Sequence, residues 1–241
     1  MIAARKGRRF ARWFSSVAER RINRAFEAVS VRGLGALRER CAEGPVLVVS
    51  NHTAWWDPLL VLFLCERVLG VDAYAMMDAK NLHAMPFFGR VGAFGVDLAD
   101  PADGARAMRY ATKLLDRPGR LVWIFAQGRE VPITARPLVF RGGSAEIARL
   151  ARTCAVVPAA LRYEHGKAER PTAFASFGEA LATSRDVARG RALHEAAVTT
   201  ELDAIDRALV AGELGGFETL LRSEPSWLGA LLARVLAIVT R

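Results

Sequence analysis

A histidine and an aspartate stand five positions apart, directly after a short run of apolar residues. The run, residues 46–49, is rich in valine and predicts a buried strand that starts after the turn-forming pair Gly44-Pro45. His52 and Asp57 follow in a polar turn at the carboxyl end of this strand, where open α/β sheets bind their ligands. A histidine can take a proton from a hydroxyl near neutral pH, and a carboxylate on its second ring nitrogen fixes the tautomer. The spacing therefore favours general-base chemistry by His52, with Asp57 orienting the ring.

No enzyme nucleophile accompanies this pair. The sequence has no G-x-S-x-G motif, and residues 142–146 do not make one. We therefore expect the hydroxyl of a substrate to be the nucleophile, which means acyl transfer without a covalent enzyme intermediate. The residues alone leave a second interpretation open, in which His52 is a structural turn residue and Asp57 a helix N-cap.

The histidines do not predict a metal site. His52 with one aspartate lacks the three or four ligands that zinc needs, and His83, His165 and His194 stand in no ligand spacing. We predict neither a metal nor a cofactor.

Four segments, in order, resemble the glycerophospholipid acyltransferases of the 1-acylglycerol-3-phosphate type. They are Asn51-His52-x4-Asp57, residues 80–97 with their lysine, proline and glycines before Asp97, residues 124–129, and residues 156–161 with an embedded proline. The resemblance covers about residues 46–162. It implies transfer of a fatty acyl group from acyl-CoA or acyl carrier protein to a lipid hydroxyl.

Two positions depart from the family pattern. Leu98 stands where the family has an arginine associated with the phosphate of the acceptor, and Gln127 replaces the usual glutamate of the third segment. The chain thus resembles a glutamine-bearing branch of the family near carotenoid and glycolipid pathways. A carotenoid glycoside or a glycolipid is therefore an alternative acceptor to a lysophospholipid. A catalytically silent lipid-binding relative and a thioesterase are further alternatives.

Several residues are candidates for substrate binding. Asn51 shapes the turn or binds substrate, the amide of Gln127 suits a neutral hydroxyl, and the backbone at Gly128 suits an oxyanion. Arg129 and Arg136 are candidates for phosphate contact.

Four other residues have less specific expectations. Trp55 and Trp56 either line the path of the acyl chain or belong to the core. Lys80 and Arg90 are expected to meet the phosphates of an acyl carrier.

The charge of the chain is concentrated at its start. Residues 1–40 contain 11 of the 34 basic residues and 3 of the 25 acidic ones, so they carry +8 of a net charge of +9. Aromatic and aliphatic residues recur among these charges at roughly helical spacing. We therefore predict basic amphipathic helices over residues 1–40 that bind an anionic membrane surface. A solvated charged helix is the alternative, and the lack of a base-reading motif speaks against nucleic acid.

The rest of the chain predicts one α/β domain over residues 41–215. Expected strands (residues 73–77, 121–125, 155–161 and 172–177) alternate with expected helices (residues 58–69, 103–116 and 184–211, with a break near Gly190). This order favours a mostly parallel or mixed central sheet flanked by helices. Residues 216–241 are expected to end in an apolar helix over 227–239, which is shorter than the ~20 residues of a membrane span. A peripheral enzyme at the cytoplasmic face of a membrane, with three reduced cysteines, is the resulting prediction.

Overall fold

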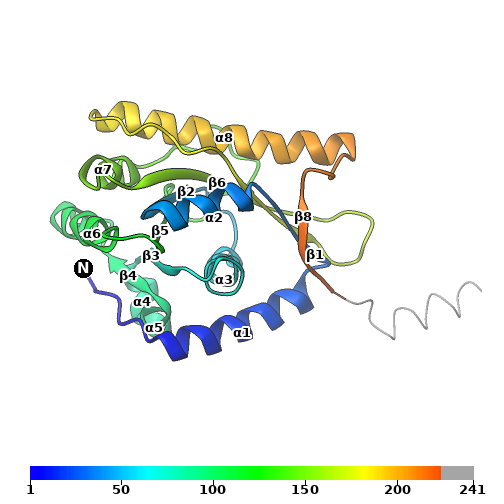
Figure 1. Ribbon diagram of the computed structural model, residues 1–241, viewed down its shortest axis with the longest axis horizontal. Coiled ribbons are helices and arrows are strands. Elements are labelled where there is room, and N and C mark those ends of the chain that lie inside the picture. Colours follow the sequence, from blue (N-terminus) through cyan, green and yellow to red (C-terminus); the bar gives the residue numbers. More distant parts are fainter. Residues whose placement is uncertain (224–241) are drawn as a thin grey trace, which may run out of the picture.

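Eight strands form one sheet in the computed structural model, which describes residues 1–223 (Figure 1). The order across the sheet is β4-β3-β5-β2-β6-β7-β1-β8. The strands are β1 (Ala28–Arg32), β2 (Val46–Ser50), β3 (Asp72–Asp78), β4 (Ala93–Val96), β5 (Arg120–Phe125), β6 (Ala155–Glu164), β7 (Thr172–Phe177) and β8 (Glu218–Arg222). The predicted α/β class is confirmed, and all five strands expected from the sequence are present.

The sheet is mixed. Strand β2 lies between β5 and β6 and runs parallel to both, and β3 runs parallel to β4 and β5. The β6–β7 and β1–β8 pairs are antiparallel. Ser50 at the end of β2 is in register with Phe125 and Ala159, so the carboxyl ends of β5 and β2 lie side by side. The turns that follow these strands therefore open on the same edge of the sheet.

Helices cover both faces of the sheet (Figure 1). One face carries α1 (Arg8–Ala25), α2 (Leu34–Glu43), α3 (Asp57–Phe63) with the π-helical turn η1 (Leu64–Leu69), α4 (Ala79–Ala84) and α5 (Phe87–Val91). The other face carries α6 (Pro101–Leu114), α7 (Gly143–Leu150) and α8 (Val187–Ala211).

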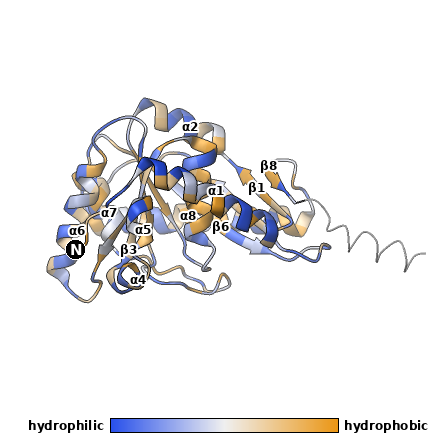
Figure 2. Cartoon of the chain, turned by 90° about the horizontal axis from the view of Figure 1, so that it is seen from below, coloured by the Kyte–Doolittle hydropathy of each residue, from blue (hydrophilic) through white to orange (hydrophobic). Residues whose placement is uncertain are grey.

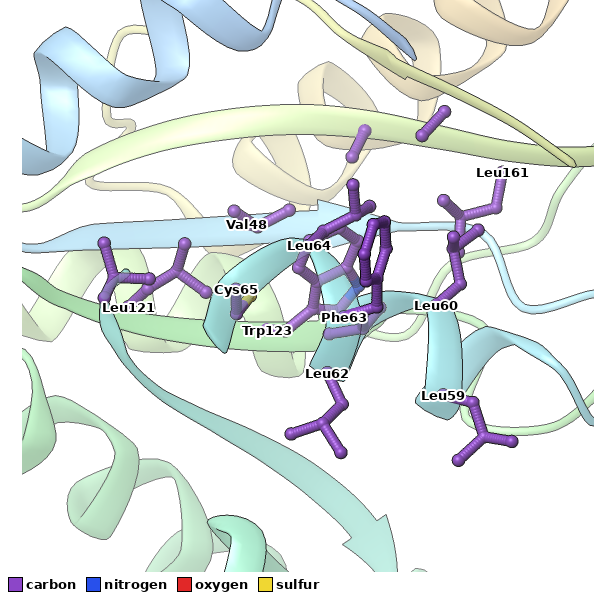
Figure 3. Packing of buried hydrophobic residues seen from close by; sticks show 14 of the residues in the cluster. Val48, Leu59, Leu60, Leu62, Phe63, Leu64, Cys65, Leu121, Trp123 and Leu161 are labelled. Atoms are coloured by element: carbon purple, nitrogen blue, oxygen red, sulfur yellow. The ribbon is translucent and has the colours of Figure 1, made fainter. Parts of the chain in front are cut away.

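Strand β2 shows why its residues form the centre of the sheet. Val46 and Val48 point into the core under α3, whereas Leu47 and Val49 point into the core under α7 and α8. Side chains alternate between the two faces of a strand, so a strand covered on both faces reads as one continuous apolar run. Figure 3 shows Val48 packed with Leu64 and Trp123 beneath α3 and η1.

The N-terminal region differs from its prediction. Residues 8–25 form the predicted basic amphipathic helix, but Ala28–Arg32 is a buried strand between β7 and β8, so residues 1–40 are not helical throughout. Valines at alternate positions form this strand. Because arginines surround them in the sequence, the segment was interpreted as part of a basic helix. At the other end of the chain, β8 pairs with β1, although residues 216–241 were expected to lie outside the α/β domain. The sheet therefore includes strands on both sides of the expected domain, residues 41–215. The helix expected over 227–239 lies outside the described residues.

Helix α8 is continuous through Gly190, where a break was expected. A Cβ at this position would lie 3.1 Å from the Cβ of Ala145, so the glycine permits close packing of α8 against α7. Packing thus outweighs the low helix propensity of glycine here.

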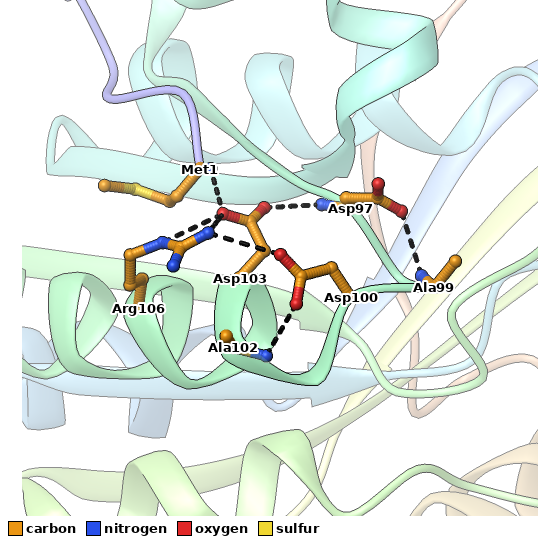
Figure 4. Close-up of polar contacts among 7 residues, drawn as sticks. All are labelled: Met1, Asp97, Ala99, Asp100, Ala102, Asp103 and Arg106. Carbon is orange, nitrogen blue, oxygen red and sulfur yellow. Dashed lines mark hydrogen bonds and ion pairs between the residues drawn. The ribbon is translucent and has the colours of Figure 1, made fainter.

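Residues 1–7 run as a strap across β4 and α5. Ile2 exchanges two backbone hydrogen bonds with Gly95, of 2.9 and 2.8 Å, and the Arg5 N–H donates to the Gly89 carbonyl. The α-amino group of Met1 pairs with Asp103, whose second oxygen accepts from the Asp97 N–H at 2.8 Å (Figure 4). These bonds fix the loop after β4, which carries Leu98.

Figure 2 views the molecule from the side of α1 and shows hydrophilic residues along this helix, with hydrophobic residues on the strands behind it. Among residues 1–223, no helix is both long and apolar enough to cross a bilayer.

Candidate active site

The predicted His–Asp pair is formed. His52 lies in the turn after β2, and its Nδ1 is 2.7 Å from Oδ2 of Asp57, the first residue of α3. The Asp57 side chain is fully buried, whereas 17% of the His52 side chain is exposed. An ionised carboxylate only accepts hydrogen bonds, so Nδ1 carries the proton and Nε2 is left as a proton acceptor.

Backbone groups hold the carboxylate in place. Oδ2 of Asp57 also accepts from the N–H groups of Thr53 and Ala54, at 2.7 and 3.0 Å. The alternative that Asp57 is a helix N-cap is wrong, because Trp56 is the N-cap of α3 and Asp57 is its first residue; Asp57 instead binds the turn before the helix and faces the imidazole. The His52 ring stacks on Phe125, with ring centroids 4.4 Å apart. These contacts leave the imidazole one orientation.

Asn51 and Gln127 hold the turn in place through hydrogen bonds to backbone groups. The amide of Asn51 exchanges bonds of 2.9 and 2.8 Å with the carbonyl and N–H of Leu161 and thereby joins the end of β2 to β6. Oε1 of Gln127 accepts from the His52 N–H at 2.8 Å, and Nε2 donates to the Leu138 carbonyl at 3.0 Å. Both side chains are buried. Their geometry is that of supports for His52, and neither lines the cavity described next.

An apolar cavity of about 520 Å³ opens beside His52. It lies between the face of β3 and β4 and the helices α3, α4 and α5. Its wall is formed mainly by small and flexible apolar residues, including Val61, Leu62, Cys65, Ala73, Ala75, Met77, Met85, Phe88, Gly92, Ala93 and Leu98. Along β3, the distance from Asp78, near the His52–Asp57 pair, to Ala73 is roughly 16 Å. A volume of this size with few polar groups suits a chain-like apolar ligand.

Charged residues occur at the mouth of this cavity. Arg129 is the single cation among its described lining residues, and Asp78 and Glu130 supply two carboxylates. Gly128 also lines the cavity, but its N–H donates to the Phe125 carbonyl at 3.0 Å and is therefore occupied in the turn. Leu98 lines the wall of the cavity.

Arg136 lies away from the cavity. Its guanidinium donates to the carbonyls of Ile133 and Ala135, and it lies 3.9 Å from a carboxylate oxygen of Asp206 on α8. Lys80 and Arg90 do not line the cavity either, and the Arg90 guanidinium lies 4.0 Å from the centroid of the Phe10 ring.

The two tryptophans divide between the two expected roles. Trp55 lines the cavity and is 48% exposed, whereas Trp56 packs edge-on against Phe26 at 5.1 Å.

Sequence reasoning missed one polar contact of the dyad. The Tyr163 hydroxyl donates to Oδ1 of Asp57 at 2.6 Å, across 106 residues of sequence. It also missed the small residues of β3 and β4, whose common side only the sheet pairing reveals. Throughout the described residues, no cluster of three or more histidine, cysteine or carboxylate side chains is placed to hold a metal ion.

These features define an α/β enzyme-like site, with an oriented imidazole at the carboxyl ends of parallel strands and an apolar cavity beside it. Residues 28–162, more than half of the chain, match the family described as Acyltransferase, and the chain belongs to that family. The fold is similar to the crystal structure of the 1-acyl-sn-glycerophosphate (LPA) acyltransferase PlsC from Thermotoga maritima, with a TM-score of 0.58. The match has 16% sequence identity and covers 81% of this chain and 79% of that chain, which shows a shared fold. No curated protein sequence matches this chain.

Proposed function

We propose that this acyltransferase moves a fatty acyl group from an acyl thioester to the hydroxyl of a lipid at a membrane surface, with His52 as the general base. The observation that carries the proposal is the His52–Asp57 pair at the mouth of an apolar cavity of about 520 Å³. The similar fold of PlsC, whose name describes an acyltransferase for 1-acyl-sn-glycerophosphate, supports a lipid acceptor.

The proposed step needs no enzyme nucleophile. Nε2 of His52 takes the proton of the acceptor hydroxyl while its oxygen attacks the thioester carbonyl carbon. The tetrahedral intermediate then expels the thiolate as the C–S bond breaks, and the imidazolium returns its proton to the sulfur. Asp57, in contact with Nδ1 at 2.7 Å, stabilises the positive charge on the ring between these two events. The donor is acyl-CoA or acyl carrier protein.

The acyl chain is proposed to lie in the apolar cavity along β3. This places the thioester carbonyl beside His52 and the hydrocarbon against Ala73, Ala75 and Met77. Burial of a hydrocarbon chain contributes about 0.8 kcal/mol for each methylene group. The cavity can therefore supply most of the free energy that holds the donor.

The mouth of the cavity favours an uncharged acceptor over a phosphate monoester. Its described lining carries two carboxylates against one arginine, and Leu98, whose side chain cannot bind phosphate, lines the same cavity. A neutral glycolipid or carotenoid glycoside, the second candidate acceptor, would bring no charge to this mouth.

Helix α1 is proposed to bind an anionic, cytoplasmic-type leaflet. Its outward face exposes Arg9, Arg12, Arg20 and Arg24, and Trp13 among them is 57% exposed. Arg21, on the same helix, lies 5.2 Å from the ring of Trp55 at the cavity. Each arginine near such a leaflet contributes about 1 kcal/mol to binding. This orientation would present the cavity mouth to lipid.

The test is a transfer assay with a labelled acyl thioester on vesicles, with and without a panel of lysophospholipid and glycolipid acceptors. We expect acylated lipid only where an acceptor is present. Thiol release at the same rate without any acceptor would identify a thioesterase, and no reaction with any acceptor would identify a silent relative.

A further inference from the structure

The buried carboxylate of Asp57 receives four hydrogen bonds that divide unequally between its oxygens. Oδ2 accepts from Nδ1 of His52 and from two backbone N–H groups. Oδ1 accepts from the Tyr163 hydroxyl at 2.6 Å, the only donor to it among the described residues. Because Asp57 is fully buried, removing this donor leaves a charged oxygen without water or protein to replace it.

The Tyr163 ring is itself held firmly. It lies near the end of β6, where its backbone is in register with Ala173 of β7. Its ring packs against Phe26 with centroids 5.3 Å apart, and Phe26 in turn meets Trp56 of the catalytic turn at 5.1 Å. The hydroxyl therefore reaches Asp57 from a rigid strand.

The chemistry of this contact suits a donor. Burial, together with the negative charge of Asp57, holds the pKa of the Tyr163 hydroxyl well above its ordinary value. The hydroxyl thus keeps its proton and donates it to the carboxylate. A hydrogen bond to a charged acceptor is short and strong, and here it fixes the plane of the carboxylate that Nδ1 of His52 must meet.

We propose that Tyr163 is a positioning residue for the acyl-transfer reaction, which acts on His52 through Asp57 and does not touch substrate. This rests on the proposed function. The competing role is packing alone, in which the ring contributes to the core and the hydroxyl does not affect turnover.

The first test is Tyr163→Phe, which keeps the ring on Phe26 and removes only the hydroxyl. We expect kcat to fall roughly tenfold or more, because a hydrogen bond to a buried charge is lost. KM for donor and acceptor should change less than about twofold, since Tyr163 does not line the cavity. The matched control is Tyr74→Phe, which removes a hydroxyl 3.3 Å from Asp72 and also away from the cavity, and it should leave kcat unchanged.

A double-mutant cycle separates positioning from packing. In the Asp57→Asn background the charge supported by Tyr163 is gone, so Tyr163→Phe should cost little further activity. Additive losses in kcat would overturn the proposal, as would native kcat in the single Tyr163→Phe variant.

A second readout does not depend on turnover. The proton on Nδ1 of His52 should give a downfield NMR resonance, assigned by its disappearance in His52→Ala. Tyr163→Phe should shift or broaden this resonance, and Tyr74→Phe should not. An unchanged resonance contradicts the positioning role. A shifted resonance in a protein that transfers no acyl group would instead retain the role of Tyr163 and reject the proposed function.

Discussion

Substitution of Leu98 by arginine tests how the cavity mouth selects its acceptor. Leu98 lines the same cavity as Arg129, Asp78 and Glu130, and the loop that carries it is fixed by the Asp97–Asp103 bond of 2.8 Å. A charge-assisted contact to phosphate contributes about 1.5–3 kcal/mol, which corresponds to roughly tenfold to more than a hundredfold in rate or affinity. The two carboxylates at the mouth compete for the new guanidinium, so the lower end of this range is expected.

The assay compares kcat/KM for lysophosphatidic acid with kcat/KM for an uncharged glycolipid, with the same acyl donor. The wild-type chain should prefer the uncharged acceptor, and Leu98→Arg should raise the ratio for lysophosphatidic acid about tenfold. Leu98→Met is the control, since it changes shape without charge and should leave the ratio unaltered. A wild-type preference for lysophosphatidic acid that persists in Arg129→Ala would show that the mouth does not act through charge.

Two further predictions concern the membrane and stability. Arg9→Ser combined with Arg20→Ser should weaken binding to anionic vesicles roughly thirtyfold at low salt, at about 1 kcal/mol for each arginine. The matched pair Arg189→Ser and Arg207→Ser on the opposite face should have no such effect in a sedimentation assay. Burial lowers the pKa of His194 to about 4, from its value near 6.5 in the unfolded chain. The contribution of the neutral ring to stability is therefore complete above pH 6.5 and is lost as the pH falls from 6.5 toward 4. Urea unfolding should show a loss of about 3 kcal/mol from this group between pH 7 and pH 4, which His194→Asn removes; an unchanged pH dependence in that variant would contradict this assignment.

The sequence predicted the parts of the fold that local patterns specify. Residues 46–49 form β2 because both faces of the strand are covered, and such a strand is continuously apolar. The pair His52 and Asp57 lies close in sequence, so its contact was predictable from spacing and chemistry. The family resemblance supplied the order of the four segments.

What the sequence did not predict depends on long-range pairing. Tyr163 reaches Asp57 only because β6 lies next to β2, which no local pattern specifies. Gln127 was interpreted as a substrate ligand from its place after a strand, but the chain folds its amide beneath the His52 backbone. The cavity could not be predicted without the pairing of β3 and β4, which brings their small residues to one side of the sheet. Strand β1 was hidden because its valines lie among arginines that belong to neighbouring helices.

The most direct test of the account is the rate of acceptor-dependent thiol release by His52→Ala, measured with the acyl donor and acceptor that the wild-type protein uses best. General-base catalysis contributes roughly 10²–10⁴-fold, so kcat should fall by at least a hundredfold while the melting temperature stays near that of the wild type. The His52 side chain is 17% exposed, which makes its loss more tolerable for the fold, whereas the fully buried Asp57 is less suited to this test. A folded His52→Ala protein that turns over at close to the wild-type rate would contradict the central claim that His52 takes the proton from the acceptor.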